Sequence, residues 1–88
     1  MYKLDKNKDV VISQGSTGTY VVRLTEDSMP LQGKYVTFVM KGKTVGGVLT
    51  DSSGYARFTI SNLPASSTPY AITAKYSNVK VTNKIYVK

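Results

Sequence analysis

Few side chains of this chain can do chemistry, because its 88 residues include neither histidine nor cysteine. Their absence removes the commonest general base, the thiolate nucleophile and the usual zinc ligands. A pair of carboxylates can still hydrolyse a glycosidic bond. The carboxylates present all occupy positions typical of loops or strand ends: Asp5, Asp9, Glu26, Asp27 and Asp51. We therefore predict that the protein is not an enzyme and has no catalytic, cofactor-binding or metal-binding residues.

The stretch TDSSGYARFTI, residues 50–60, contains a polar loop that invites comparison with a calcium site. An EF-hand loop needs alternating acidic residues, a glycine and a closing glutamate between helices. This loop has one carboxylate and lies between strand-like runs. A turn explains it fully, because Asp51 can accept backbone N–H groups and Gly54 can adopt a positive φ. We predict a hairpin that joins a strand at 44–50 to one at 55–61.

The net charge of +7 comes mainly from lysines, which fall near the chain ends and at one expected hairpin tip. Lysine commonly protects the edges of sheets, whereas nucleic-acid interfaces group their basic residues and favour arginine. Gly42, Gly46 and Gly47 lie near Lys41 and Lys43 but match no phosphate-binding fingerprint. No apolar run reaches the roughly 20 residues of a membrane helix. We expect neither a nucleic-acid partner nor membrane insertion in this segment.

Apolar and polar residues alternate with a period of two nearly everywhere, which predicts β-strands. The expected strands are residues 9–13, 18–25, 34–41, 44–50, 55–61, 69–76 and 79–88. Gly42-Lys43 fits a two-residue hairpin tip, and Gly46-Gly47 suggests a bulge, a bend or an edge strand. Seven short strands with regular turns are typical of an all-β, immunoglobulin-like β-sandwich with two antiparallel sheets, here a single domain over residues 1–88. Its expected core includes Val22, Leu24, Val36, Phe38, Phe58, Ile60, Ile72 and Tyr76.

Several tyrosines and one asparagine stand out within this pattern. Tyr70 fits the tyrosine of immunoglobulin-type sandwiches that bonds the backbone a few residues upstream. Tyr35, Tyr55 and Tyr86 fall on the outward face, where they either pair across strands or form a contact surface for sugar or protein. Asn83 has inward parity, which predicts a bond to the backbone or a bulge. A Lys–Asn crosslink is a further alternative for Asn83, and an intact mass would test it.

Three stretches resemble segments of bacterial and archaeal Ig-like (Big-type) repeat domains. GTYVVRLTEDSMPLQGKYVTF is similar to their strand, polar turn, Pro-x-x-Gly and Val-x-Phe segment, and TDSSGYARFTI to Thr-Asp-x-x-Gly-x-Ala-x-Phe. LPASSTPYAITAKYSN is similar to Leu-Pro-Ala-Gly followed by Tyr-x-Ile-x-Ala-x-Tyr. The similarity runs in the expected order from about Gly15 to Val87. The chain departs from the pattern in two loops, at 27–29 and 66–68.

The resemblance implies a non-catalytic module of an adhesin-like cell-surface protein, either a stalk spacer or an adhesive unit. Its partners would be neighbouring repeats of the same chain, and cell-wall polysaccharide or a host-surface protein. The implied location is extracellular, at the cell surface, and the family has no catalytic residues or cofactors to transfer. The alternative is a carbohydrate- or protein-binding accessory domain of a secreted enzyme or a phage structural protein.

Overall fold

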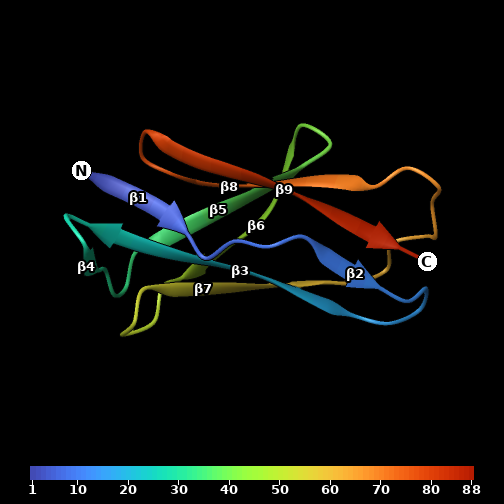
Figure 1. Cartoon of the computed structure of the whole chain (residues 1–88), viewed down its shortest axis with the longest axis horizontal. Helices are drawn as coiled ribbons and strands as arrows, with labels where there is room; N and C mark the ends of the chain where they lie inside the picture. The colour runs from blue at the N-terminus through green and yellow to red at the C-terminus, as the bar shows by residue number, and fades with distance from the viewer.

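The computed structural model describes all 88 residues and contains nine β-strands and no helix (Figure 1). The strands are β1 (Tyr2–Asp5), β2 (Val10–Ile12), β3 (Gly18–Glu26), β4 (Met29–Pro30), β5 (Tyr35–Met40), β6 (Lys43–Leu49), β7 (Tyr55–Ile60), β8 (Tyr70–Tyr76) and β9 (Val79–Val87). They form two sheets that face each other across one core, so the predicted immunoglobulin-like β-sandwich is confirmed. We call the sheet containing β3 sheet A and the sheet containing β9 sheet B.

The two sheets divide the strands unequally. In sheet A, β3 pairs with β1, β4 and β7; sheet B has the order β2-β9-β8-β5-β6. Two strands were not predicted, the four-residue β1 and the two-residue β4. Both are short: β1 alternates over only four residues, YKLD, and β4 is the dipeptide Met29-Pro30, so neither is long enough for a period of two to identify a strand. The expected all-antiparallel pairing is also wrong at one place, because β2 runs parallel to β9.

The core follows from the alternation, because inward side chains of both sheets interdigitate in the space between them. On β3, Tyr20, Val22 and Leu24 are completely buried, as the period of two predicts. Phe58 packs against this core and stacks on Phe38 with ring centroids 4.8 Å apart, but it is only partly buried. The buried hydrophobic residues are Leu4, Ile12, Tyr20, Val22, Leu24, Val36, Phe38, Met40, Ala56, Ile60, Ile72, Ala74, Ile85 and Val87.

The β5–β6 hairpin has its tip one residue earlier than predicted. Lys41 and Gly42 form the tip, and both have a positive φ, 52° and 73°. Two positive φ values are the signature of a type I′ turn, whose twist matches that of the flanking strands. Two of the alternatives for Gly46-Gly47 are confirmed: the β5–β6 register shifts and leaves Val45 without a partner, which is a bulge, and β6 is an edge strand of sheet B.

The loop at residues 50–54 does not form the predicted hairpin. Strand β6 pairs with β5 in sheet B, whereas β7 pairs with β3 in sheet A. The loop therefore carries the chain from one sheet to the other. A tight turn is compatible with either outcome, and the pairing partners of the flanking strands decide between them.

Sheets are also exchanged between β1 and β2. Strand β1 pairs with the C-terminal half of β3, and after Lys6, which has a φ of 58°, the chain crosses to sheet B and pairs with β9. The molecule is elongated, with extents of 39 × 22 × 18 Å. The two termini lie at opposite ends of its long axis (Figure 1).

Candidate functional site

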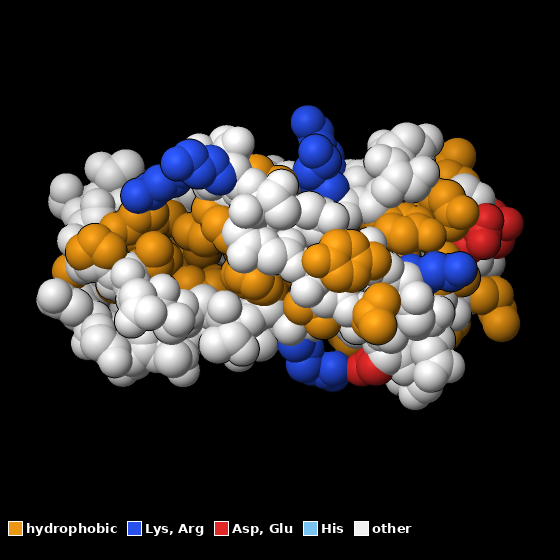
Figure 2. Space-filling model, turned by 180° about the vertical axis from the view of Figure 1, so that it is seen from behind, with side chains coloured by type: hydrophobic (Ala, Val, Ile, Leu, Met, Phe, Trp, Pro, Cys, Tyr) orange, Lys and Arg blue, Asp and Glu red, His pale blue; other side chains and the backbone are white.

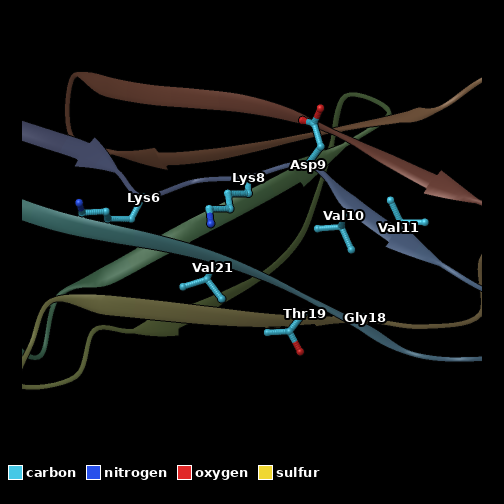
Figure 3. Close-up of a pocket in the computed structure, with 8 residues that line it drawn as sticks. All are labelled: Lys6, Lys8, Asp9, Val10, Val11, Gly18, Thr19 and Val21. Carbon is cyan, nitrogen blue, oxygen red and sulfur yellow. The ribbon is translucent and has the colours of Figure 1, made fainter.

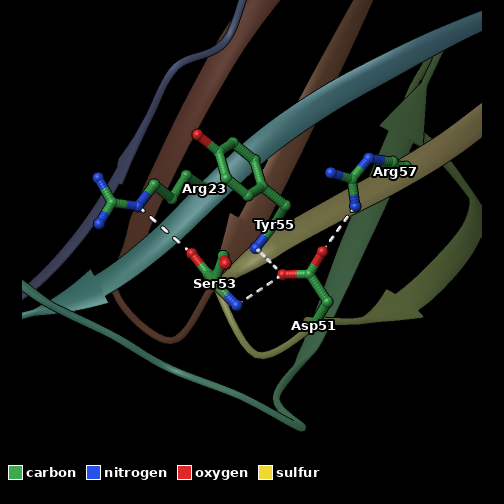
Figure 4. A network of polar contacts seen from close by, with 5 residues as sticks. All are labelled: Arg23, Asp51, Ser53, Tyr55 and Arg57. Atoms are coloured by element: carbon green, nitrogen blue, oxygen red, sulfur yellow. Dashed lines mark hydrogen bonds and ion pairs between the residues drawn. The ribbon is translucent and has the colours of Figure 1, made fainter.

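The Asp51 loop is held by a compact set of polar contacts (Figure 4). Asp51 Oδ1 accepts hydrogen bonds from the backbone N–H groups of Ser53 (2.9 Å) and Tyr55 (3.0 Å). Its other oxygen, Oδ2, pairs with the Arg57 guanidinium at 2.6 Å. Arg57, followed by the backbone donors, holds the pKa of the Asp51 carboxyl below its usual range. Both oxygens are occupied within the loop, so the contacts support the interpretation as a turn.

Gly54 fixes this loop against sheet A. Its φ is 84°, and a Cβ built there would lie 2.5 Å from the carbonyl oxygen of Leu24. The backbone N–H of Leu24 in turn donates to the Gly54 carbonyl at 2.8 Å. Only a residue without a side chain fits this approach. The loop thus stabilises the connection between the sheets, and its one carboxylate is fully used in these contacts.

A second polar cluster surrounds Asn83 on β9. Asn83 Oδ1 accepts hydrogen bonds from Tyr20 Oη and from Asn7 Nδ2, both at 2.6 Å. Asn83 Nδ2 donates to Asp9 Oδ1 at 2.9 Å, and the same oxygen accepts the backbone N–H of Lys84. The prediction of a backbone bond or bulge at Asn83 is wrong, because its partners are side chains and the β8–β9 register is regular. No lysine amine is among those partners.

The Asn83 cluster ties both sheets to the connector between β1 and β2. Burial, with a smaller contribution from Asp9, raises the pKa of the Tyr20 hydroxyl to about 12. The Lys84 N–H, followed by the Asn83 amide, holds the pKa of Asp9 below its usual range. Sequence reasoning missed this grouping. The sequence indicated this cluster only through two inward-facing polar residues on separate strands, Tyr20 and Asn83. Because buried polar groups need hydrogen-bond partners, the two could have been expected to bond each other.

The structure does not bring the three outward tyrosines together. Tyr55 lies on sheet A, whereas Tyr35 and Tyr86 lie on sheet B. Thr37 pairs with Lys75 and Ile85 with Tyr70, so extending these two registers puts Tyr35 level with Ser77 and Tyr86 level with Pro69. Eight residues of strand separate these levels, about 26 Å at the usual rise per residue. The three tyrosines therefore do not share one surface, and a contact role for each of them stays a prediction.

Each outward tyrosine has a local neighbour instead. Tyr35 is 58% exposed, faces Leu49 across the strands and has its ring over Gly47, where a Cβ would overlap the ring. The Tyr55 ring lies 5.2 Å from the Arg57 guanidinium. Tyr86 is in register with Val11 of β2. The Tyr35–Leu49 and Tyr86–Val11 pairs match the cross-strand interpretation, whereas Arg57 lies two residues from Tyr55 on the same strand, β7.

Tyr70 has the structural role expected for it. Its hydroxyl donates to the carbonyl oxygen of Pro64 at 2.8 Å, six residues upstream. The ammonium group of Lys41 lies 5.1 Å from its ring centroid. The prediction of a tyrosine corner is confirmed, and it anchors the long loop that leads into β8.

The cationic side chains do not form a continuous stripe on the face that Figure 2 shows. They stand in separate groups between apolar and uncharged areas (Figure 2). Lys80 and Lys84 lie on the part of β9 that pairs with β8 alone, because β2 pairs only with residues 85–87. That position agrees with lysine as protection for an open strand edge.

No group of three or more histidine, cysteine, aspartate or glutamate side chains is placed to hold a metal ion. The structure also has no helix with the length and apolar character needed to cross a membrane. Among the carboxylates, Asp51 is paired with Arg57, Asp9 with Asn83, and Asp27 with the N-terminal amino group at 2.7 Å.

No protein-family model and no curated protein matches the chain. Among solved structures, the chain is similar to the C-terminal 282-residue fragment of intimin, which was crystallised with the intimin-binding domain of the translocated intimin receptor. The identity is 24% and the TM-score 0.60 over 97% of this chain. The chain spans 32% of the length of the intimin fragment. At this identity the similarity shows that the fold is shared.

Proposed function

We propose that the protein is a non-catalytic Ig-like module of an adhesin-like protein at the microbial cell surface, acting as a stalk spacer. The observation that carries this proposal is the position of the termini at opposite ends of the 39 Å axis. A chain that enters at one end and leaves at the other can be joined head to tail. Copies joined in this way form a rod. In it, the partners of each module are the neighbouring repeats of the same extracellular chain.

The strand arrangement suits such a rod mechanically. Pulling at the two ends draws β2 toward the N-terminal end and the parallel strand β9 toward the C-terminal end. Their hydrogen bonds, together with the flanking bond from Lys88 N–H to the Ile12 carbonyl, are then loaded along the strands and share the force. The fold shared with the intimin fragment, which was crystallised in complex with a receptor's intimin-binding domain, fits this proposal.

The spacer role is tested by joining two and three copies of the chain directly and measuring their maximum dimension by small-angle X-ray scattering. We expect the dimension to grow by about 39 Å for each copy. A matched series with flexible Gly-Ser linkers controls for simple tethering and should have a broader distance distribution. If the direct fusions fold back and their dimension scarcely grows, the spacer proposal is wrong.

A second candidate is a binding module, either an adhesive unit or an accessory domain of a secreted enzyme or phage protein. Tyr35 and Leu49 favour it, because they lie opposite each other on the outer face of sheet B and are 58% and 62% exposed. Direct binding of cell-wall polysaccharide to the wild-type chain, lost in Tyr35→Ala/Leu49→Ala, would support this candidate. Equal binding by both chains would remove this face from consideration.

A further inference from the structure

One stretch of β3 has a neighbouring strand on one side only. Strand β1 pairs with residues 23–26 of β3, and β7 pairs with residues 18–23 on the opposite side. Strand β2 could have extended the β1 side, but it pairs with β9 of the other sheet. Residues 18–22 therefore form an open edge within sheet A, which we call the open β3 edge.

The direction of the backbone groups along this edge follows from the ladder. Leu24 N–H donates to Gly54 on the β7 side. In an antiparallel pair, successive residues direct their N–H and C=O groups to alternate sides of the strand. Tyr20 and Val22 therefore face β7, whereas Thr19 and Val21 direct two N–H and two C=O groups to the open side. These four backbone groups have no neighbouring strand with which to form hydrogen bonds.

A depression of about 410 Å³ lies along the open β3 edge (Figure 3). Thr19 and Val21 line it from β3, and Lys6 and Lys8 line it from the connector between β1 and β2. At one end the depression reaches Gly18, whose inward side is packed by Ile12, because a Cβ there would lie 2.7 Å from the isoleucine side chain. At the other end β1 begins its pairing, so the length of the edge suits about five residues of extended chain.

We propose that the open β3 edge binds an extended, acidic peptide segment of a partner protein as an added strand. Strand addition supplies both the donors and the acceptors that Thr19 and Val21 require, whereas a polyphosphate backbone supplies acceptors alone. Lys6 and Lys8 select acidic side chains at the rim. Asp9 also borders the depression, and its Oδ1 accepts from the Asn83 amide and from the backbone N–H of Lys84; the two lysines outnumber this one carboxylate and leave the rim with a net positive charge.

A second copy of this chain is a poor occupant. Its net charge of +7 opposes association at a lysine-lined edge. Its few carboxylates are also spread along the chain, so none of its strands offers alternating acidic residues. This proposal does not depend on the stalk role, because a free strand edge serves a single module as well as an array.

The test uses the whole chain, labelled with ¹⁵N, and the synthetic peptide Ac-TETETE-NH₂ as the probe. We expect saturable shifts of the Thr19 and Val21 amide resonances and slower hydrogen exchange at both. The same peptide with N-methylated backbone amides should not bind, because its donors are blocked. Reversal of the rim charges in Lys6→Glu/Lys8→Glu should weaken binding by about tenfold.

Proline substitution separates strand addition from simple charge attraction. Val21→Pro removes one outward N–H of the open β3 edge without removing a bond to β7, and should abolish binding. Thr59→Pro is the matched control, because Thr59 faces outward on the opposite edge of the same sheet, and it should bind normally. If Val21→Pro does not fold, the N-methylated peptide still decides the question with the unmodified chain.

Three results would overturn the proposal. The first is no shift at Thr19 and Val21 at millimolar peptide. The second is equal binding of the N-methylated peptide, which would indicate charge attraction alone. The third is a shift confined to β6 or β7, which would place the peptide on the other edge of the sandwich.

Discussion

Removing the Tyr20 hydroxyl measures what the Asn83 cluster contributes to stability. Tyr20 is completely buried and donates to Asn83 Oδ1 at 2.6 Å. Tyr20→Phe deletes this bond and leaves no cavity beyond the lost oxygen. Asn83 Oδ1 still accepts from Asn7, so no orphaned acceptor remains. We therefore expect a cost near the net value of one hydrogen bond, about 1 kcal/mol, which lowers Tm by about 4–8 °C in a domain of this size.

Asn83→Ala should cost more, about 2–4 kcal/mol, because it leaves the buried Tyr20 hydroxyl without a partner and releases Asn7 and Asp9. In the double variant Tyr20→Phe/Asn83→Ala the orphaned hydroxyl is gone as well. Its cost should therefore not exceed that of Asn83→Ala, which gives a coupling of about 1–2 kcal/mol. Urea denaturation followed by circular dichroism measures all four proteins.

Alkaline pH provides a second readout of the same residue. The folded protein holds the Tyr20 proton up to a pKa of about 12, whereas the ordinary value is 10.0. The resulting stability is complete below pH 10 and is lost as the pH rises toward 12. In Tyr20→Phe, this part of the loss of stability at alkaline pH should be absent. Two results together would refute the role given to this cluster. The first is that the stability losses of Tyr20→Phe and Asn83→Ala add up to that of the double variant within about 0.5 kcal/mol. The second is that Tyr20→Phe loses stability above pH 10 as the wild-type protein does.

Three further substitutions test the loop and the core. Asp51→Asn should remove part of the acid sensitivity: the carboxyl has a lowered pKa in the folded state, so its stabilisation is present above the ordinary value of 3.8 and is lost as the pH falls below it. Gly54→Ala should cost about 2–4 kcal/mol, because it combines a positive φ with a clash against the backbone of Leu24. Phe58→Ala should cost about 2–3 kcal/mol, less than a fully buried phenylalanine, since Phe58 is partly exposed. Urea denaturation measures each cost, at several pH values for Asp51→Asn.

Matched controls sharpen the expectations for Gly54→Ala and Phe58→Ala. Gly42→Ala introduces the same positive-φ strain at a tip with open space, so it should cost clearly less than Gly54→Ala. Phe38→Ala removes the completely buried partner of Phe58 and should cost more than Phe58→Ala. Equal effects within either pair would contradict the packing described for these positions. An unchanged acid limb in Asp51→Asn would contradict the contact with Arg57.

Local sequence features predicted the secondary structure well where the cause was itself local. The alternation along residues 20–24 put the correct side chains in the core, because successive side chains of a strand point to opposite faces. Tyr70 and the Asp51 turn were recognisable from short spacings that a few residues satisfy among themselves. The position of the β5–β6 tip was less certain from sequence, since both Gly42-Lys43 and Lys41-Gly42 place a glycine at the turn.

Partner choice over long separations was beyond sequence reasoning. Asn83 bonds Tyr20 and Asn7, which lie 63 and 76 positions away, and nothing in their spacing indicates contact. The 50–54 loop was predicted to be a hairpin because a turn looks the same whether its strands pair or separate. The open β3 edge depends on the crossing of the chain between β1 and β2, which only the assembled sandwich shows.

The sequence by itself determined that this protein is a β-sandwich with apolar inward faces, a tyrosine corner and no histidine or cysteine chemistry. These properties depend on composition and on a period of two, both of which are written along the chain. Tertiary structure decided which sheet each strand joins, which polar groups meet at Asn83 and which edge of β3 is left open. Those outcomes depend on competition between distant strands for the same backbone partners. The sequence of one strand does not indicate which other strand it will pair with.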